Sequence, residues 1–217
     1  MGNADLEPQK TVQYEVGVQQ QFGDNIGIDV TGFYKDINNL LGSKIVTNFT
    51  NEVYGTYINR DYGNVKGLTF SLNKRFADGF SANLDYTYSV AEGNASDPNS
   101  AFWDAQNNRE TEKQLVYLDW DQRHTLKATV LIKLPFAVNV SFVGEYGSGL
   151  PYTPNSPTLE GGAFENSARR PQTMNLDMHF SKLIELGKRK INLTANVYNL
   201  LDIRNEIMMY DDTGRSG

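Results

Sequence analysis

The sequence predicts an all-β fold, an antiparallel up-and-down transmembrane β-barrel segment of about eight strands. The first observation is residues 80–90, where apolar and polar side chains alternate at every position. Such alternation gives a strand two faces that meet different surroundings, and a tilted strand crosses a bilayer in roughly 9–11 residues. The second observation is that this pattern recurs about eight times along the chain. The third is that short turns and long polar loops alternate between the repeats.

The composition is compatible with this fold and excludes several others. The chain has 217 residues and a net charge of −6, with a sequence pI of about 5.0, which argues against a nucleic-acid-binding surface. Hydrophobic residues make up 39%, and no window approaches the ~18 uninterrupted apolar residues of a membrane-spanning helix. Without cysteine there is neither a disulfide framework nor a thiolate metal site. Because residues 1–5 lack signal-peptide features, we expect a removed signal or a segment of a longer protein.

The elements follow in order from the alternation. The predicted strands are about 11–22, 26–37, 62–76, 80–90, 123–134, 136–147, 172–185 and 190–201. Short turns are predicted near 23–25, 77–79, 134–136 and 187–189, and long polar loops near 38–61, 93–122, 148–171 and 202–217. Short turns at one rim and long loops at the other are typical of outer-membrane barrels. A soluble sandwich mixes loop lengths at both ends.

The two registers of the strands predict two environments. The apolar register is predicted to face lipid and includes Leu84, Tyr86, Val130, Val140, Phe142 and Leu193. The polar register is predicted to face the lumen and includes Glu15, Asp29, Asp85, Glu145, Asp177 and His179. A closed eight-stranded barrel is only wide enough for packed side chains, so it holds these charges only as a paired network. The polar register therefore favours a larger barrel, of which this chain is a segment with two strand edges to satisfy.

Seven motifs, in order along almost the whole chain, resemble TonB-dependent outer-membrane receptors. They are residues 3–11 (NADLEPQKT) with 14–17 (YEVG), 33–37 (FYKDI), 64–68 (NVKGL), 121–126 (DQRHTL), 146–153 (YGSGLPYT), 175–177 (NLD) and 196–202 (NVYNLLD). Ala4 stands where the family often has proline. The plug domain, the TonB box and a final strand ending in an aromatic residue are not found in residues 1–217.

The resemblance implies a function for the whole protein rather than for this segment alone. Residues 1–217 would be a partial receptor β-barrel, giving about eight consecutive strands before the last of a barrel of about 22. The protein would lie in the bacterial outer membrane and import a scarce nutrient, such as an iron chelate, a vitamin or a glycan. Its implied partners are outer-membrane lipid, the small nutrient ligand, the rest of the barrel, and the TonB complex acting through the absent plug. Neither enzyme activity nor a cofactor is expected.

Two alternatives from other classes remain at this point. One is a self-contained eight-stranded outer-membrane barrel that acts as an anchor or adhesin. The other is a soluble all-β binding module. Dependence on lipid separates the soluble module from both barrels, and the number of strands in the closed barrel separates the other two.

Candidate binding residues lie on or beside the long loops. The aromatic residues Trp103, Tyr117, Trp120 and Tyr152 fit equally a surface that stacks on a substrate and an aromatic belt at the membrane rim. Asp121 and His124 are close in sequence, but residues three apart in a strand point to opposite faces. We therefore predict a rim network in which Arg123 binds a loop carbonyl or carboxylate, and no catalytic group. The acidic loop residues show no regular metal-ligand spacing, so no metal site is predicted. These are Asp97, Asp104, Asp211 and Asp212.

Overall fold

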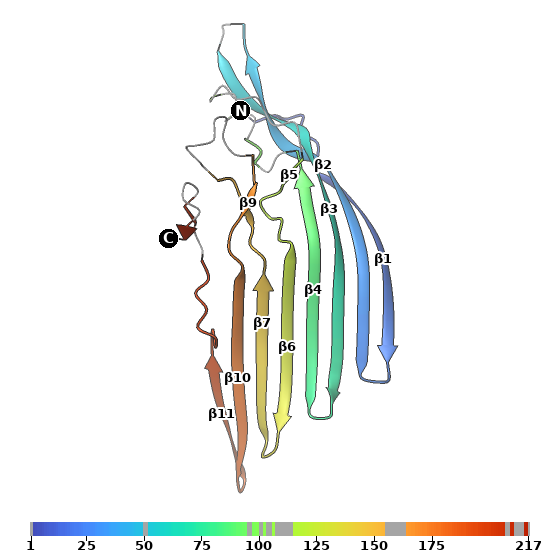
Figure 1. Ribbon diagram of the computed structural model, residues 1–217, viewed down its shortest axis with the longest axis vertical. Helices are drawn as coiled ribbons and strands as arrows, with labels where there is room; N and C mark the ends of the chain where they lie inside the picture. The colour runs from blue at the N-terminus through green and yellow to red at the C-terminus, as the bar shows by residue number, and fades with distance from the viewer. Residues whose placement is uncertain are drawn as a thin grey trace.

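The chain forms one long antiparallel sheet (Figure 1). A computed structural model describes residues 2–49, 52–94, 97–99, 102, 106, 115–154, 164–206, 209–210 and 215–216. The long strands are β1 (Lys10–Phe22), β2 (Ile26–Thr47), β3 (Val53–Ala77), β4 (Phe80–Gly93), β6 (His124–Leu134), β7 (Val138–Gly147), β10 (Thr173–Leu186) and β11 (Arg189–Val197). They are hydrogen-bonded in the order β1-β2-β3-β4-β6-β7-β10-β11. Each long strand lies beside the next one along the chain, which confirms the up-and-down topology.

The short turns lie together at one end of the sheet (Figure 1). The turn between β3 and β4 contains Asp78 at φ 53° and Gly79 at φ 86°. Two successive positive φ angles give a hairpin whose twist matches that of its strands, and Asp-Gly is a favoured pair for it. The turn between β6 and β7 reaches the same geometry without glycine, with Phe136 at φ 62° and Ala137 at φ 56°.

The prediction of a long polar loop near residues 38–61 is wrong. β2 and β3 continue through most of it as a paired hairpin that extends beyond the neighbouring strands (Figure 1). The reason is an irregularity in the pairing between Ile37 and Leu41, where Asn39 takes a φ of 62°. A bulge shifts the alternation of side chains between the two faces, so the continuing strand no longer shows a period of two in its sequence.

The other long loops contain short strands that sequence analysis did not predict. β5 (Val116–Tyr117) pairs with the end of β4, and β8 (Pro151–Tyr152) pairs with β9 (Ala168–Arg169). β12 (Met209–Tyr210) pairs with β13 (Arg215–Ser216), and β11 ends at Val197 rather than near residue 201. These pairs are too short to produce a visible alternation.

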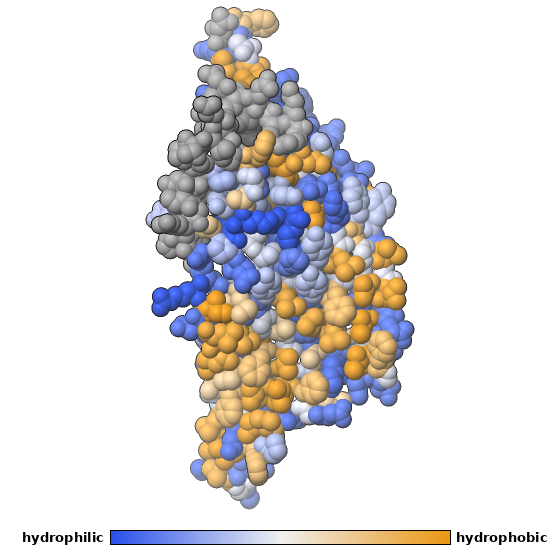
Figure 2. All heavy atoms as spheres, viewed as in Figure 1, coloured by the Kyte–Doolittle hydropathy of each residue, from blue (hydrophilic) through white to orange (hydrophobic). Residues whose placement is uncertain are grey.

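The register between strands keeps the two predicted faces separate across the whole sheet. Phe142 lies opposite Val130 on one side and Met178 on the other, and Tyr86 lies opposite Leu126. The six residues of the predicted lipid register share this face. Figure 2 shows apolar side chains gathered over the part of the sheet that ends in short turns.

A small hydrophobic cluster lies on the opposite, polar face, toward the long loops. It consists of Ile37, Val65, Ala91 and Leu118, with Phe33 and Leu40 packed against it. Leu118 comes from the segment after β5, so this cluster holds that segment onto the sheet. Phe33 breaks the alternation of β2 because its ring lies over Gly67 of β3.

We expect Gly67→Ala to destabilise the folded sheet by about 1–3 kcal/mol, because overpacking forces neighbouring groups to move. A Cβ at Gly67 would lie 2.4 Å from the carbonyl oxygen of Tyr88 and 2.5 Å from the Phe33 ring. The matched control is Gly27→Ala, since no heavy atom lies within 4 Å of a Cβ there. The check is the unfolding midpoint of the protein in lipid. Equal midpoints for the two variants would contradict the close approach.

The sheet has two open edges. β1 and β11 stand at opposite ends of the strand order, and within the described ranges they do not pair with each other. Unpaired N–H and C=O groups of a strand edge are costly in lipid. In a bilayer, each of these edges would need a pairing partner. Among the described residues, no helix is long and apolar enough to span a membrane.

Candidate functional site

A buried carboxylate organises the end of the sheet that carries the long loops. The side chain of Asp121 is 0% exposed. It accepts hydrogen bonds from the backbone N–H of Ala91 at 2.7 Å, from Nε of Arg123 at 2.8 Å, and from Nη2 of Arg169. Nη1 of Arg169 also donates to the carbonyl oxygens of Asp121 at 2.8 Å and of Gly149 at 3.2 Å. We call Asp121, Arg123 and Arg169 the rim clasp.

Local backbone geometry brings the three residues together. The backbone N–H of Asp121 donates to the carbonyl of Leu118 at 2.7 Å, which turns the chain toward β6. On the other side, Gly149 passes so close to the segment before β10 that a Cβ would lie 1.5 Å from the carbonyl oxygen of Arg170. Only glycine permits that approach. The clasp thus connects the end of β4, the start of β6 and the loop around β9.

Hydrogen bonds and an aromatic ring both stabilise the positive charges of the rim clasp. Burial alone would lower the pKa of Arg123, but its hydrogen bonds to Asp121 and Tyr117 outweigh burial and raise that pKa. Arg123 therefore stays protonated. The guanidinium carbon atoms of Arg123 and Arg169 lie 4.4 and 5.3 Å from the centroid of the Tyr117 ring, within the range of cation–π contact.

The predicted aromatic residues occupy different positions in this region. The ring of Tyr117, in β5, contacts the two arginines of the rim clasp. Tyr152, in β8, is partly buried. Asn166 joins the neighbouring Thr153 to Tyr117, because its backbone N–H donates to the Thr153 hydroxyl and its side chain donates to the Tyr117 carbonyl. Trp120 is 53% exposed. Trp103 lies outside the described residues.

The sequence predicted one contact of this network and missed two of its residues. The prediction that Arg123 binds a loop carbonyl or carboxylate is confirmed by its bond to Asp121. Arg169 and Asn166 were missed, because each bonds residues more than 40 positions away, a separation that local periodicity cannot reveal. The one signal for Asn166 is its residue type, because asparagine tolerates the positive φ of 55° found there.

The pair Asp121 and His124 does not form a catalytic dyad. Nδ1 of His124 lies 2.8 Å from the hydroxyl of Tyr86, and the His124 ring lies against those of Tyr86 and Tyr88 on the apolar face. Asp121 instead binds the two arginines. Among the described residues there is no cluster of three or more potential metal ligands. Asp104, Asp211 and Asp212 lie outside the described residues.

The predicted lumen residues share the polar face of the sheet, as their pairing shows. Their partners on this face are short polar side chains or side chains of opposite charge. Asp85 accepts from Ser71 at 2.7 Å, and Glu145 pairs with Lys127 at 3.9 Å. The remaining contacts are Glu15 with Gln13, Asp29 with Thr31, Asp177 with Asn175 and Asn199, and His179 with Asn196.

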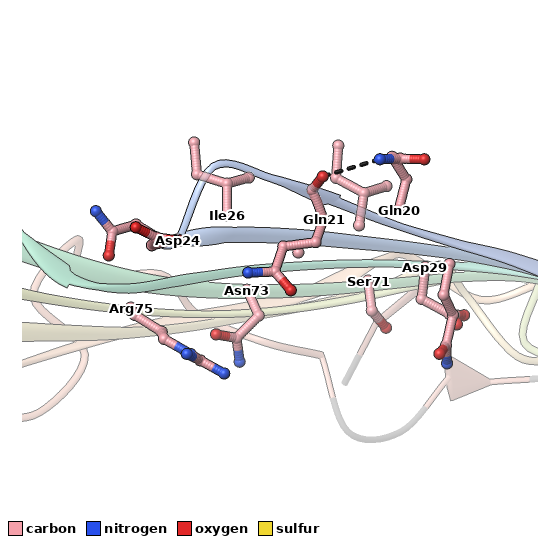
Figure 3. Close-up of a pocket in the computed structure, with 12 residues that line it drawn as sticks. Gln20, Gln21, Asp24, Ile26, Asp29, Ser71, Asn73 and Arg75 are labelled. Atoms are coloured by element: carbon pink, nitrogen blue, oxygen red, sulfur yellow. Dashed lines mark hydrogen bonds between the residues drawn. The ribbon is translucent and has the colours of Figure 1, made fainter.

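The polar face is hollowed near the short turns, between β1, β2 and β3 (Figure 3). This depression has a volume of about 600 Å³. In Figure 3 the side chains of Asp29, Ser71, Asn73 and Arg75 point to the same side of the sheet. The lining combines amides and charged groups with Ile26 and Ile28, and its polar groups suit contact with water or with a polar protein surface.

Comparison with known proteins identifies the family. The family described as TonB dependent receptor-like, beta-barrel, matches residues 1–200. The chain therefore belongs to the β-barrel domain of TonB-dependent receptors, which are transporters of the bacterial outer membrane rather than enzymes. A comparison with curated protein sequences finds no match.

Three solved structures with the same fold are distant in sequence. The outer-membrane transporter YddB from Escherichia coli is 15% identical with a TM-score of 0.68, covering 98% of this chain and 31% of that protein. The ferric-catecholate import receptor Fiu from E. coli K12 is 16% identical with a TM-score of 0.62, covering 99% and 26%. The pyoverdine receptor FpvA from Pseudomonas aeruginosa PAO1 is 13% identical with a TM-score of 0.61, covering 91% and 26%. The chain thus spans about a quarter to a third of these proteins.

Proposed function

We propose that this chain forms part of the wall of an active transporter that imports a scarce nutrient, an iron chelate, a vitamin or a glycan, with energy from the TonB complex. The observation that carries the proposal is a two-faced sheet of the receptor family with an open edge at each side. The apolar face would contact outer-membrane lipid, and the polar face would line the lumen. The names of Fiu and FpvA, a ferric-catecholate importer and a pyoverdine receptor, support uptake of this kind.

The rest of the receptor would complete the structure around these residues. Additional strands would pair with β1 and β11 and close a barrel of about 22 strands. A plug domain in the lumen would contact the polar face and transmit force from the TonB complex. A self-contained barrel of eight strands is disfavoured, because β1 and β11 do not pair within the described part of the chain.

The direct test is uptake by cells that carry or lack the receptor containing this chain. Cells are compared for accumulation of labelled ferric chelates, vitamin B12 and oligosaccharides, with the TonB gene present or deleted. We expect one of these classes to be accumulated only when both the receptor and TonB are present. Uptake by the receptor that is independent of TonB would indicate a passive channel and contradict the proposal.

Cysteine labelling should show which end of the sheet faces the outside. The chain has no cysteine, so a single introduced thiol is labelled without background. Phe49→Cys, at the fully exposed tip of the β2–β3 hairpin, should react on intact cells with a membrane-impermeant maleimide. Lys188→Cys, in the short turn before β11, should react only after the outer membrane is permeabilised. The reverse pattern would invert the topology.

A further inference from the structure

A second, smaller cavity lies in the hairpin that β2 and β3 form beyond the sheet. Its volume is about 270 Å³. Its lining includes Ser43, Tyr54, Gly55, Tyr57, Asn99 and Phe102. The hairpin lies at the end of the sheet opposite the short turns (Figure 1). We call this cavity the hairpin pocket.

The hairpin pocket contains a polar group with no partner. Ser43 is 4% exposed, and its hydroxyl has no hydrogen-bond partner within the part of the chain that the structure describes. A buried hydroxyl without a partner is costly to the folded state. It can both donate and accept a hydrogen bond. A ligand in the hairpin pocket would satisfy it.

The other described side chains that line the hairpin pocket are also neutral. The Tyr57 hydroxyl donates to Oδ1 of Asn99 at 3.2 Å, so its oxygen can still accept a hydrogen bond from a ligand. Phe102 supplies an apolar wall. A Cβ on Gly55 would lie 3.1 Å from the Phe102 ring, so glycine at this position allows the ring to approach the hairpin backbone. Among the residues that the structure describes, the lining includes no lysine, arginine, aspartate or glutamate.

We propose that the hairpin pocket binds one neutral, hydroxyl-bearing ring, as found in a sugar unit of a glycan. The proposal rests on the proposed transport function and narrows its substrate. An anionic chelate is recognised through arginine or lysine, and the described residues of this lining offer neither. A sugar ring presents hydroxyls that match Ser43 and Tyr57, and an apolar face that fits against an aromatic ring. The volume is slightly below the usual range for drug-sized ligands, about 300–1,000 Å³, which fits a single ring.

The test uses the complete receptor that contains this chain, purified in detergent. Binding is measured by titration calorimetry with the neutral trisaccharides maltotriose, cellotriose and mannotriose, and with an anionic ferric catecholate complex. We expect saturable binding of at least one trisaccharide. Ser43→Ala should weaken it up to about tenfold, the loss expected for one hydrogen bond. Thr47→Ala is the matched control, because Thr47 is an exposed hydroxyl residue of the same hairpin outside the lining.

A second measurement separates a binding role from a structural one. Because the Ser43 hydroxyl has no partner, Ser43→Ala should leave the melting temperature of the unliganded receptor unchanged or raise it. Gly55→Ala, which displaces the Phe102 ring, should also weaken trisaccharide binding. The inference is overturned if none of the three trisaccharides binds, or if both variants bind as the wild type does.

The outcome also distinguishes this inference from the proposed function. TonB-dependent uptake of a ferric catecholate, with affinity unchanged by Ser43→Ala and no trisaccharide binding, would overturn the sugar site and leave the transport function in place. Uptake that continues after deletion of TonB would overturn the transport function itself.

Discussion

Replacing Val130 by arginine is expected to cost the membrane-inserted receptor about 2–4 kcal/mol of stability, the range for a cation near the middle of the lipid face of a barrel. Val130 lies in the middle of β6, between Ala82 of β4 and Phe142 of β7 on the apolar face. An arginine there would place its guanidinium among hydrocarbon chains. The measurement is the free energy of unfolding of the receptor in lipid vesicles, from urea titration.

The matched control is Thr129→Arg, one residue earlier in the same strand. Thr129 lies between Asn83 and Val143 on the polar face, so the new charge would meet water and polar side chains. We expect a change of about 0.5 kcal/mol or less, as for most surface substitutions. A larger loss for Thr129→Arg than for Val130→Arg would show that the two faces are assigned the wrong way round.

The sheet could be predicted from the sequence wherever the alternation was uninterrupted. Strands β4 and β7 were predicted almost to their true bounds. Successive side chains of a strand point to opposite faces, so different surroundings on the two faces appear in the sequence as an alternation of apolar and polar residues. The same rule failed between residues 38 and 61. There Asn39 shifts the register, and Gly42 and Gly55 add no side chain to either face, so two continuing strands resembled a polar loop.

The site was predictable only where its partners are close in sequence. Asp121 and Arg123 are two residues apart, and the sequence predicted that Arg123 binds a loop carbonyl or carboxylate, which is the carboxylate of Asp121. Arg169 reaches Asp121 from a separate loop, and its position depends on how tightly Gly149 packs against the chain before β10. The hairpin pocket likewise depends on Phe102 and Asn99 lying beside strands more than 40 residues earlier. Such contacts follow from the tertiary arrangement of the sheet and its loops, which no local pattern contains.

Removing the central carboxylate of the rim clasp should be the most disruptive change near the long loops. Asp121→Ala leaves the guanidinium groups of Arg123 and Arg169 facing each other without their shared counter-ion, and the Ala91 N–H without its acceptor. Loss of one partner from a buried ion pair costs about 3–5 kcal/mol. Because the two arginine side chains are 21% and 30% exposed and can regain some water, we expect about 3 kcal/mol. Hydrogen exchange should increase first in residues 115–122 and 164–170.

Two comparisons make this prediction specific. Glu185 pairs with Lys190 at 2.8 Å, but their side chains are 61% and 69% exposed, so Glu185→Ala should cost no more than about 1 kcal/mol. In the double variant Asp121→Ala with Arg169→Met, one of the unpaired cations is gone. Its total loss should therefore be smaller than the sum of the two single losses, because residues in one network are not additive. Strictly additive losses, or equal costs for Asp121→Ala and Glu185→Ala, would show that the clasp does not hold the long loops to the sheet.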